Sequence, residues 1–125
     1  MQKEVSQRQL RVGQEIKKII ALLVERSEIR NLEDIKAMVT ITEARVTPDL
    51  KMCNVYFIAH PAEENEKIRE ALQLAANYLR KQVAARTELR YVPVLNFRID
   101  ETYAEVAKIE ALLRDPKVKK DLEKE

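Results

Sequence analysis

Apolar residues near the amino terminus recur with the spacing of one face of a helix. The members of this stripe are Ile16, Ile19, Ile20, Leu23 and Val24. Ahead of the stripe, Ser6 and Gln9 have the spacing of a capping box, in which the two residues satisfy each other's backbone amides. The pattern predicts a helix that begins after Ser6 and runs for about five or six turns.

Two runs of strand-forming residues follow, at positions 38–46 and 51–59. Between them, Thr47-Pro48-Asp49-Leu50 has turn chemistry, because proline presets φ and aspartate can bond nearby backbone. The two runs therefore predict an antiparallel hairpin. In the first run, alternation places Val39 and Ile41 on one side and Thr40 and Thr42 on the other. In the second run, alternation places Cys53, Val55 and Phe57 together on one apolar side.

A second helical stripe follows Pro61, and the acidic Glu63 and Glu64 suit the start of that helix. Its apolar positions are Ile68, Leu72, Ala75, Ala76, Leu79 and Val83. A third alternating run, at 91–100, predicts a strand, with Pro93 near its start where proline is tolerated.

A further capping box at Thr102 and Glu105 predicts a last helix that stops near Pro116. We interpret residues 1–115 as one domain and 116–125 as a charged tail, frayed or disordered. The predicted order is α-β-β-α-β-α, an α+β fold. Its three-stranded sheet has helices packed on one face, because each element has a single apolar side to bury.

Composition agrees with one small folded domain of 125 residues and 14.6 kDa, 46% hydrophobic. Lys and Arg total 23 against 21 Asp and Glu, a net charge of +2, so a nucleic-acid role depends on where the charges lie. The amino terminus has no apolar signal region, and no run reaches the roughly 20 apolar residues of a membrane span. A single cysteine fits a reducing compartment. We therefore expect a cytoplasmic protein without a membrane partner.

Candidate catalytic and metal sites are poorly supported. Cys53 and His60 lie seven positions apart on one predicted strand, roughly 23 Å when extended, so they cannot form a nucleophile–base pair. One cysteine and one histidine cannot build a closed N/S metal site, and a single glycine excludes a glycine-rich phosphate loop. No carboxylate pair stands out as an acid–base couple. We expect no catalytic residue, metal, cofactor or small-molecule substrate.

Basic residues gather at the end of the second long helix. Arg80, Lys81, Arg86 and Arg90 fall close together, and Arg8 and Arg11 lie near the start of the first helix. Such side chains contact the phosphates of a nucleic acid and release counterions from it. The alternative interpretation is that these residues only form a solvent-exposed helix face. Tyr78 is the obvious stacking candidate, and it could equally be a core residue.

Several segments together resemble the ribosome-binding factor A family, over roughly residues 8–113. They are QLRVGQEI at 9–16, ITEARVTPDL at 41–50, AANYLR at 75–80, LRYVPVLNF at 89–97, DE at 100–101 and IEALL at 109–113. The resemblance implies a KH-like (type II) fold with a kinked central helix in place of a GxxG loop. The family carries an Ala-x-Gly break, whereas Ala75 and Ala76 are followed here by Asn77. Asparagine tolerates unusual backbone, so a kink is expected, with an unbroken helix as the alternative.

The resemblance implies a ribosome assembly factor that binds the small (30S) ribosomal subunit and its 16S rRNA. It would support late maturation in the cold, including 5′-end processing, by binding and not by catalysis, and as a monomer. The implied RNA contacts are Arg80, Lys81, Arg86, Arg90, Asn77, Arg8 and Arg11, with Arg45 and Lys51 beside the hairpin turn as weaker candidates. A protein-interaction module without RNA contact is the main alternative, and a small nuclease is a further one.

Overall fold

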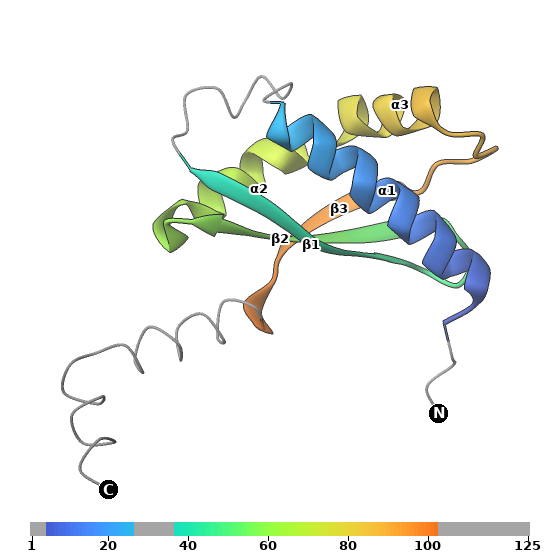
Figure 1. The fold of residues 1–125 in the computed structure, drawn as a ribbon, viewed down its shortest axis with the longest axis horizontal. Coiled ribbons are helices and arrows are strands. Elements are labelled where there is room, and N and C mark those ends of the chain that lie inside the picture. Colours follow the sequence, from blue (N-terminus) through green and yellow to red (C-terminus); the bar gives the residue numbers. More distant parts are fainter. Residues whose placement is uncertain (1–4, 27–36, 103–125) are drawn as a thin grey trace, which may run out of the picture.

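The structure is a computed structural model that describes residues 5–26 and 37–102. Along the chain these residues form α1 (Gln7–Glu25), β1 (Met38–Val46), β2 (Met52–His60), the 3-10 turn η2 (Ala62–Glu64), α2 (Asn65–Leu74), α3 (Ala76–Arg86) and β3 (Val94–Ile99) (Figure 1). This order confirms the first five predicted elements. The predicted last helix, the domain boundary at 115 and the charged tail lie outside the described residues.

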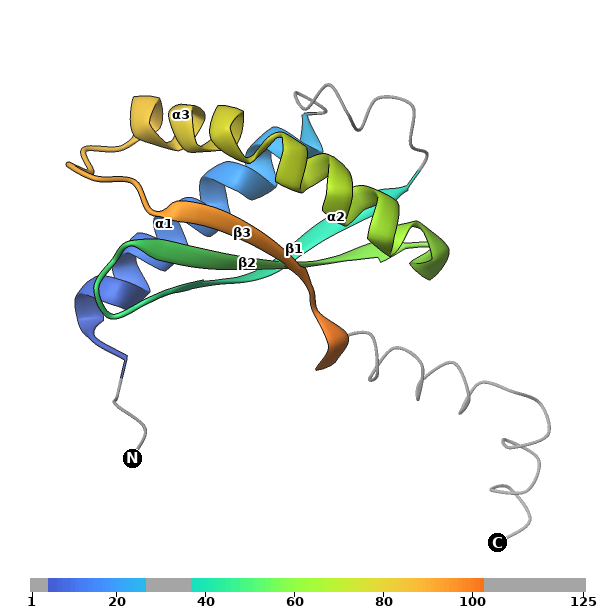
Figure 2. The same cartoon turned by 180° about the vertical axis from the view of Figure 1, so that it is seen from behind.

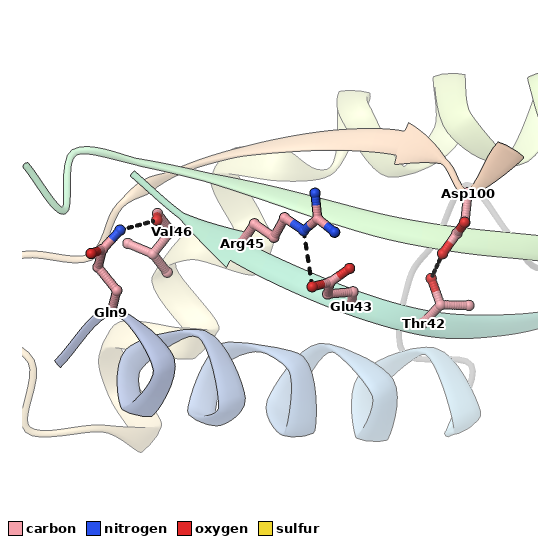
Figure 3. Close-up of polar contacts among 6 residues, drawn as sticks. All are labelled: Gln9, Thr42, Glu43, Arg45, Val46 and Asp100. Atoms are coloured by element: carbon pink, nitrogen blue, oxygen red, sulfur yellow. Dashed lines mark hydrogen bonds and ion pairs between the residues drawn. The ribbon is translucent and has the colours of Figure 1, made fainter. Parts of the chain in front are cut away.

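The capping box predicted at the start of α1 is present. The backbone amide of Gln9 donates to the Ser6 hydroxyl at 3.1 Å, and the backbone amide of Ser6 donates to Gln9 Oε1 at 2.9 Å. Gln9 also donates from Nε2 to the Val46 carbonyl at 2.9 Å, in a buried hydrogen bond (Figure 3). One side chain therefore both starts α1 and ties it to the end of β1.

The three strands form one sheet in the order β1-β2-β3. β1 and β2 are antiparallel, as predicted, and β3 lies parallel to β2 on its other side. In the hairpin turn, Asp49 Oδ1 accepts from the Thr47 hydroxyl at 2.6 Å and from the Lys51 amide at 3.1 Å. These bonds lower the pKa of Asp49, first through Thr47 and then through Lys51. The turn chemistry inferred from the sequence is thus realised in side-chain and backbone bonds.

A β-bulge in β1 changes which of its residues face the helices. The register pairs Ile41 with Phe57 but Glu43 with Tyr56, so Thr42 is the extra residue. Thr42 donates its hydroxyl to Asp100 Oδ2 at 2.6 Å (Figure 3). Simple alternation, which put Thr42 on the side of Thr40, ignores this bulge. The bulge shifts the alternation by one residue. After the bulge, the odd-numbered residues of β1 lie on the face of the sheet that the even-numbered residues occupy before the bulge.

The described helices α1, α2 and α3 lie on one face of the sheet, as predicted, and no described element covers the other face, which we call the open face (Figures 1 and 2). α1 lies mainly over β1, while α2 and α3 lie over β3. The core between the layers is aliphatic with two central phenylalanines, Phe57 and Phe97, which are 0% and 2% exposed.

The central helix is broken, as the resemblance implied. α2 ends at Leu74 and α3 begins at Ala76, with Ala75 at φ −87° and ψ 2° between them. The break is local, because the Ala75 amide still donates to Ala71 and the Leu79 amide donates to the Ala75 carbonyl. Asn77 lies within the first turn of α3, one turn short of Arg80. A change in ψ at Ala75, and not a left-handed Asn77, makes the kink.

Gln73, just before the break, covers the free edge of β3. Its Oε1 accepts from the Phe97 amide at 3.0 Å, and its Nε2 donates to the Leu95 carbonyl at 3.4 Å. A side-chain amide thus takes the place of a fourth strand along part of this edge. The same contacts fix the kinked region against β3.

Cys53 is fully buried under the helices, and burial raises its pKa to about 12. At pH 8 the thiol is therefore almost entirely protonated as well as inaccessible. We expect iodoacetamide to leave the native protein unmodified over a time in which protein unfolded in guanidinium is fully alkylated, as measured by mass spectrometry. Rapid alkylation of the native protein would contradict the burial of this strand.

Candidate nucleic-acid interface

The segment that links α3 to β3 folds back along α3. Thr87 closes the helix by donating its hydroxyl to the Val83 carbonyl at 2.8 Å. Leu89 and Val92 then pack inward against the core, while Arg90 and Tyr91 stay exposed. Two inward residues thus flank two outward ones, and the outward pair presents one cation and one aromatic ring beside the helix.

Arg80 holds this segment in place. Its Nε donates to the Val92 carbonyl at 2.9 Å, and its guanidinium lies over the Tyr91 ring, 5.2 Å from the ring centre. The residue is half-buried between α3 and the segment. Arg80 thus has a structural role in addition to the RNA contact predicted for it.

Four of the predicted RNA contacts border one hollow of about 430 Å³, which we call the α3 hollow. Its lining residues are Asn77, Arg80, Lys81, Ala84, Leu89, Arg90, Tyr91 and Val92. No acidic residue is among them, so every charged side chain in the lining of the hollow is positive. Within the described residues, Lys81 and Arg90 have no hydrogen-bond or ion-pair partner, which leaves both charges available to a ligand.

A second hollow of about 480 Å³ contains Arg8 and Arg11 at the start of α1, and we call it the α1 hollow. It shares Leu89 with the α3 hollow, so the two lie next to each other on the same side of the molecule. Glu15 and Glu88 also line it, so the formal charges of its lining offset each other. The structure thus brings six of the nine predicted residues into one continuous region.

The other predicted contacts lie outside the two hollows. Arg86 is exposed near the end of α3, where its guanidinium donates to the Gln82 side chain. Lys51 is exposed beside the hairpin turn. The RNA-binding role of all nine residues stays a prediction.

Arg45 lies on the open face of the sheet, where the bulge directs it. Its Nε is 2.9 Å from Glu43 Oε1 (Figure 3). Its guanidinium lies 5.5 Å from the centre of the Tyr56 ring. The hydrogen bond and charge of Glu43 raise the pKa of Arg45. The structure therefore separates Arg45 from the α3 hollow and pairs its charge internally.

The open face carries a larger but electrically mixed hollow of about 830 Å³. Its charged lining residues are Glu43, Arg45, Glu66, Arg69, Arg98, Asp100 and Glu101. Acids and bases offset each other there, so the hollow does not attract a polyanion as the α3 hollow does.

Two arrangements considered from the sequence, a metal cluster and a Cys–His pair, are not assembled in the described residues. No group of three or more His, Cys, Asp or Glu side chains among them could hold a metal ion. Cys53 and His60 lie near opposite ends of β2, so they cannot act as a pair. In the same ranges, no helix is long and apolar enough to span a membrane.

The sequence interpretation chose Tyr78 as the stacking residue and missed Tyr91. Both rings are exposed, at 44% and 54%, but only Tyr91 lines the α3 hollow and contacts Arg80. A signal was present in the adjacent pair Arg90-Tyr91, directly before a buried valine and proline. That pair could be placed beside Arg80 only once the return path of the segment was known.

Comparison with known proteins gives consistent matches. A family model described as ribosome-binding factor A matches residues 8–113. Curated proteins of that name from Bradyrhizobium diazoefficiens and Rhodopseudomonas palustris (strain HaA2) are 37% and 38% identical, over 96% and 94% of this chain and 83% and 87% of theirs.

Solved structures give the same result for the fold. The crystal structure of ribosome-binding factor A from Thermus thermophilus matches with a TM-score of 0.60 and 24% identity, over 73% of this chain and 94% of that one. A homology model of the Thermus thermophilus protein, fitted into a cryo-EM map of a 30S complex, matches with a TM-score of 0.55 and 29% identity, over 69% and 88% of the two chains. The predicted α+β, KH-like fold is confirmed.

Proposed function

This chain belongs to the ribosome-binding factor A family, and from that premise we propose that it binds the small ribosomal subunit through its 16S rRNA and supports late maturation of that RNA. Within that maturation, the chain assists processing of the 5′ end of the precursor rRNA. It does so by binding the RNA, as a monomer in the cytoplasm. The fitted 30S complex of the Thermus thermophilus protein supports the choice of partner.

The observation that carries the proposal is the acid-free α3 hollow beside the α1 hollow. Lys81 and Arg90 have no partner in the described residues, and Arg8 and Arg11 add two further cations on α1, beside Glu15 and Glu88. Cations arranged along a continuous region fit successive phosphates of an RNA backbone. With no catalytic group assembled around them, they would hold RNA in one arrangement while other factors cleave it.

Salt dependence tests the proposal directly. We expect co-sedimentation with purified small subunits to weaken steeply with salt, with a slope of log K against log [salt] of about −3 for roughly four phosphate contacts. The same measurement on subunits stripped of loosely bound proteins keeps the slope if RNA is the partner. Binding that is insensitive to salt, or lost on stripping, would contradict RNA contact and favour a protein-interaction module.

A further inference from the structure

Tyr91 is a large aromatic side chain left half in solvent at the rim of a cationic hollow. It is 54% exposed, although its neighbours Val92 and Pro93 are buried. Its ring is held by Arg80 and lies among the lining residues of the α3 hollow. An exposed ring in such surroundings offers an aromatic face to a ligand.

The ring is held in a defined position before any ligand binds. Arg80 covers one side of it, and Arg80 is itself fixed by its hydrogen bond to the Val92 carbonyl at 2.9 Å. The backbone of Tyr91 is anchored next to buried Val92. A restrained ring loses little conformational entropy when a planar group stacks on its remaining face.

The polar groups around the ring complement a nucleotide. Asn77 brings a side-chain amide, which can donate to and accept from the edge of a base. Lys81 and Arg90 bring unpaired cations from the helix and from the return segment, where they can contact the flanking phosphates. A stacking surface, an amide and two cations are thus combined around one hollow.

We propose that the α3 hollow is a subsite for an unpaired nucleotide, whose base stacks on Tyr91 against the side opposite Arg80. The inference rests on the proposed function and adds that RNA is bound at a single-stranded or bulged position, not along a duplex. A base paired within a helix hides its face between its neighbours, so Tyr91 can stack only on a base that is free.

The first test uses the absence of tryptophan from this chain. Tyr91→Trp introduces a single tryptophan, which can be excited selectively over the remaining tyrosines and keeps an aromatic face. Tyr78→Trp is the matched control at an exposed position of α3 outside the lining of the hollow. We expect a short oligouridylate to quench the fluorescence of Tyr91→Trp but not of Tyr78→Trp. A perfectly paired RNA stem should quench neither. Equal quenching of both variants, or quenching of Tyr91→Trp by the stem, would overturn the subsite.

The second test measures affinity. Tyr91→Leu should weaken binding of the oligouridylate about tenfold or more, because base–aromatic stacking is lost. Tyr91→Phe should bind like the unsubstituted protein, and so should Tyr78→Leu. Thermal melting will show that each variant is folded, as expected for exposed positions.

The two proposals fail in different ways. If Tyr91→Leu binds the oligouridylate as well as the unsubstituted protein does, the stacking subsite is wrong, while salt-dependent subunit binding would leave the proposed function standing. If the unsubstituted protein binds neither small subunits nor RNA, the proposed function itself is wrong. Loss of oligouridylate binding in both Tyr91→Leu and Tyr91→Phe would assign the effect to the hydroxyl and also overturn stacking.

Discussion

Replacing both Lys81 and Arg90 with glutamate is expected to lower the affinity for small ribosomal subunits by on the order of a hundredfold at physiological salt. Each substitution removes one phosphate contact and adds a repelling charge inside the α3 hollow. The slope of log K against log [salt] should become shallower by about 2. Quantitative sedimentation of subunits at several salt concentrations measures both effects.

The choice of residues follows from their contacts. The side chains of Lys81 and Arg90 are exposed and form no hydrogen bond or ion pair with another described residue, so their replacement leaves the fold intact. Arg80 is the wrong residue for this test, because losing its bond to the Val92 carbonyl would release the segment that carries Tyr91. A defect in an Arg80 variant would therefore not separate binding from local unfolding.

A matched control carries the same change in net charge elsewhere. Arg26 and Lys67 are exposed, at the end of α1 and on α2, and line neither hollow. Arg26→Glu combined with Lys67→Glu should therefore retain most of the affinity. Equal losses in the two double variants would mean that overall charge, and not the α3 hollow, governs binding, and our site assignment would be refuted.

Elements specified by neighbouring residues were predictable from the sequence. The capping box of Ser6 and Gln9 needs only residues three apart, and the hairpin turn needs only Thr47, Asp49 and the proline between them. Helical and alternating periodicity likewise indicated which faces are buried. These features depend on local geometry, so the order of elements and the packing of helices on one face followed from pattern.

Features set by contacts distant in sequence were not predictable. The bulge at Thr42 is stabilised by Asp100, which lies 58 positions away. That bulge decides that Arg45 lies on the open face, apart from the other candidates. The bond from Arg80 to Val92 spans 12 positions and brings Tyr91 to the helix. Neither contact has a local signal in the residues it joins.

The kink shows what a resemblance adds to periodicity. The apolar positions from Ile68 to Val83 fit one continuous helix, so pattern alone allowed an unbroken element. The resemblance placed the break at Ala75, Ala76 and Asn77, and the structure locates it at Ala75. Asparagine tolerates left-handed backbone, but in the described ranges the non-glycine residue with positive φ is Leu50 and not Asn77. The break needs no such conformation.

Gly13, the one glycine in the chain, lies within α1 where the helix crosses β1. A Cβ atom added there would lie 2.6 Å from the carbonyl oxygen of Ala44. Carbon and oxygen do not approach so closely without a bond. Because the obstacle is backbone in the middle of a strand, it cannot turn aside as a side chain could, and α1 must move away from the sheet.

Gly13→Ala is therefore expected to destabilise the protein, although alanine favours helix over glycine by about 1 kcal/mol. Displacing α1 disturbs Val12 and Ile16, which pack in the core, at a cost of about 3 kcal/mol for an overpacked contact. The net loss of about 2 kcal/mol should lower the melting temperature by roughly 10 °C in a domain of this size. Circular dichroism during thermal unfolding measures the change.

Gln14→Ala is the control for Gly13→Ala, because Gln14 is exposed on the same turn of α1 and makes no contact with β1 that alanine would lose. It should leave the stability within about 0.5 kcal/mol of the unsubstituted protein. If Gly13→Ala were as stable as this control, α1 would have room to shift at no cost. The close approach of helix and strand would then not be what requires glycine at this position. If it is destabilised as expected, the position of Arg8 and Arg11 beside the α3 hollow depends on the smallest side chain in the helix that carries them.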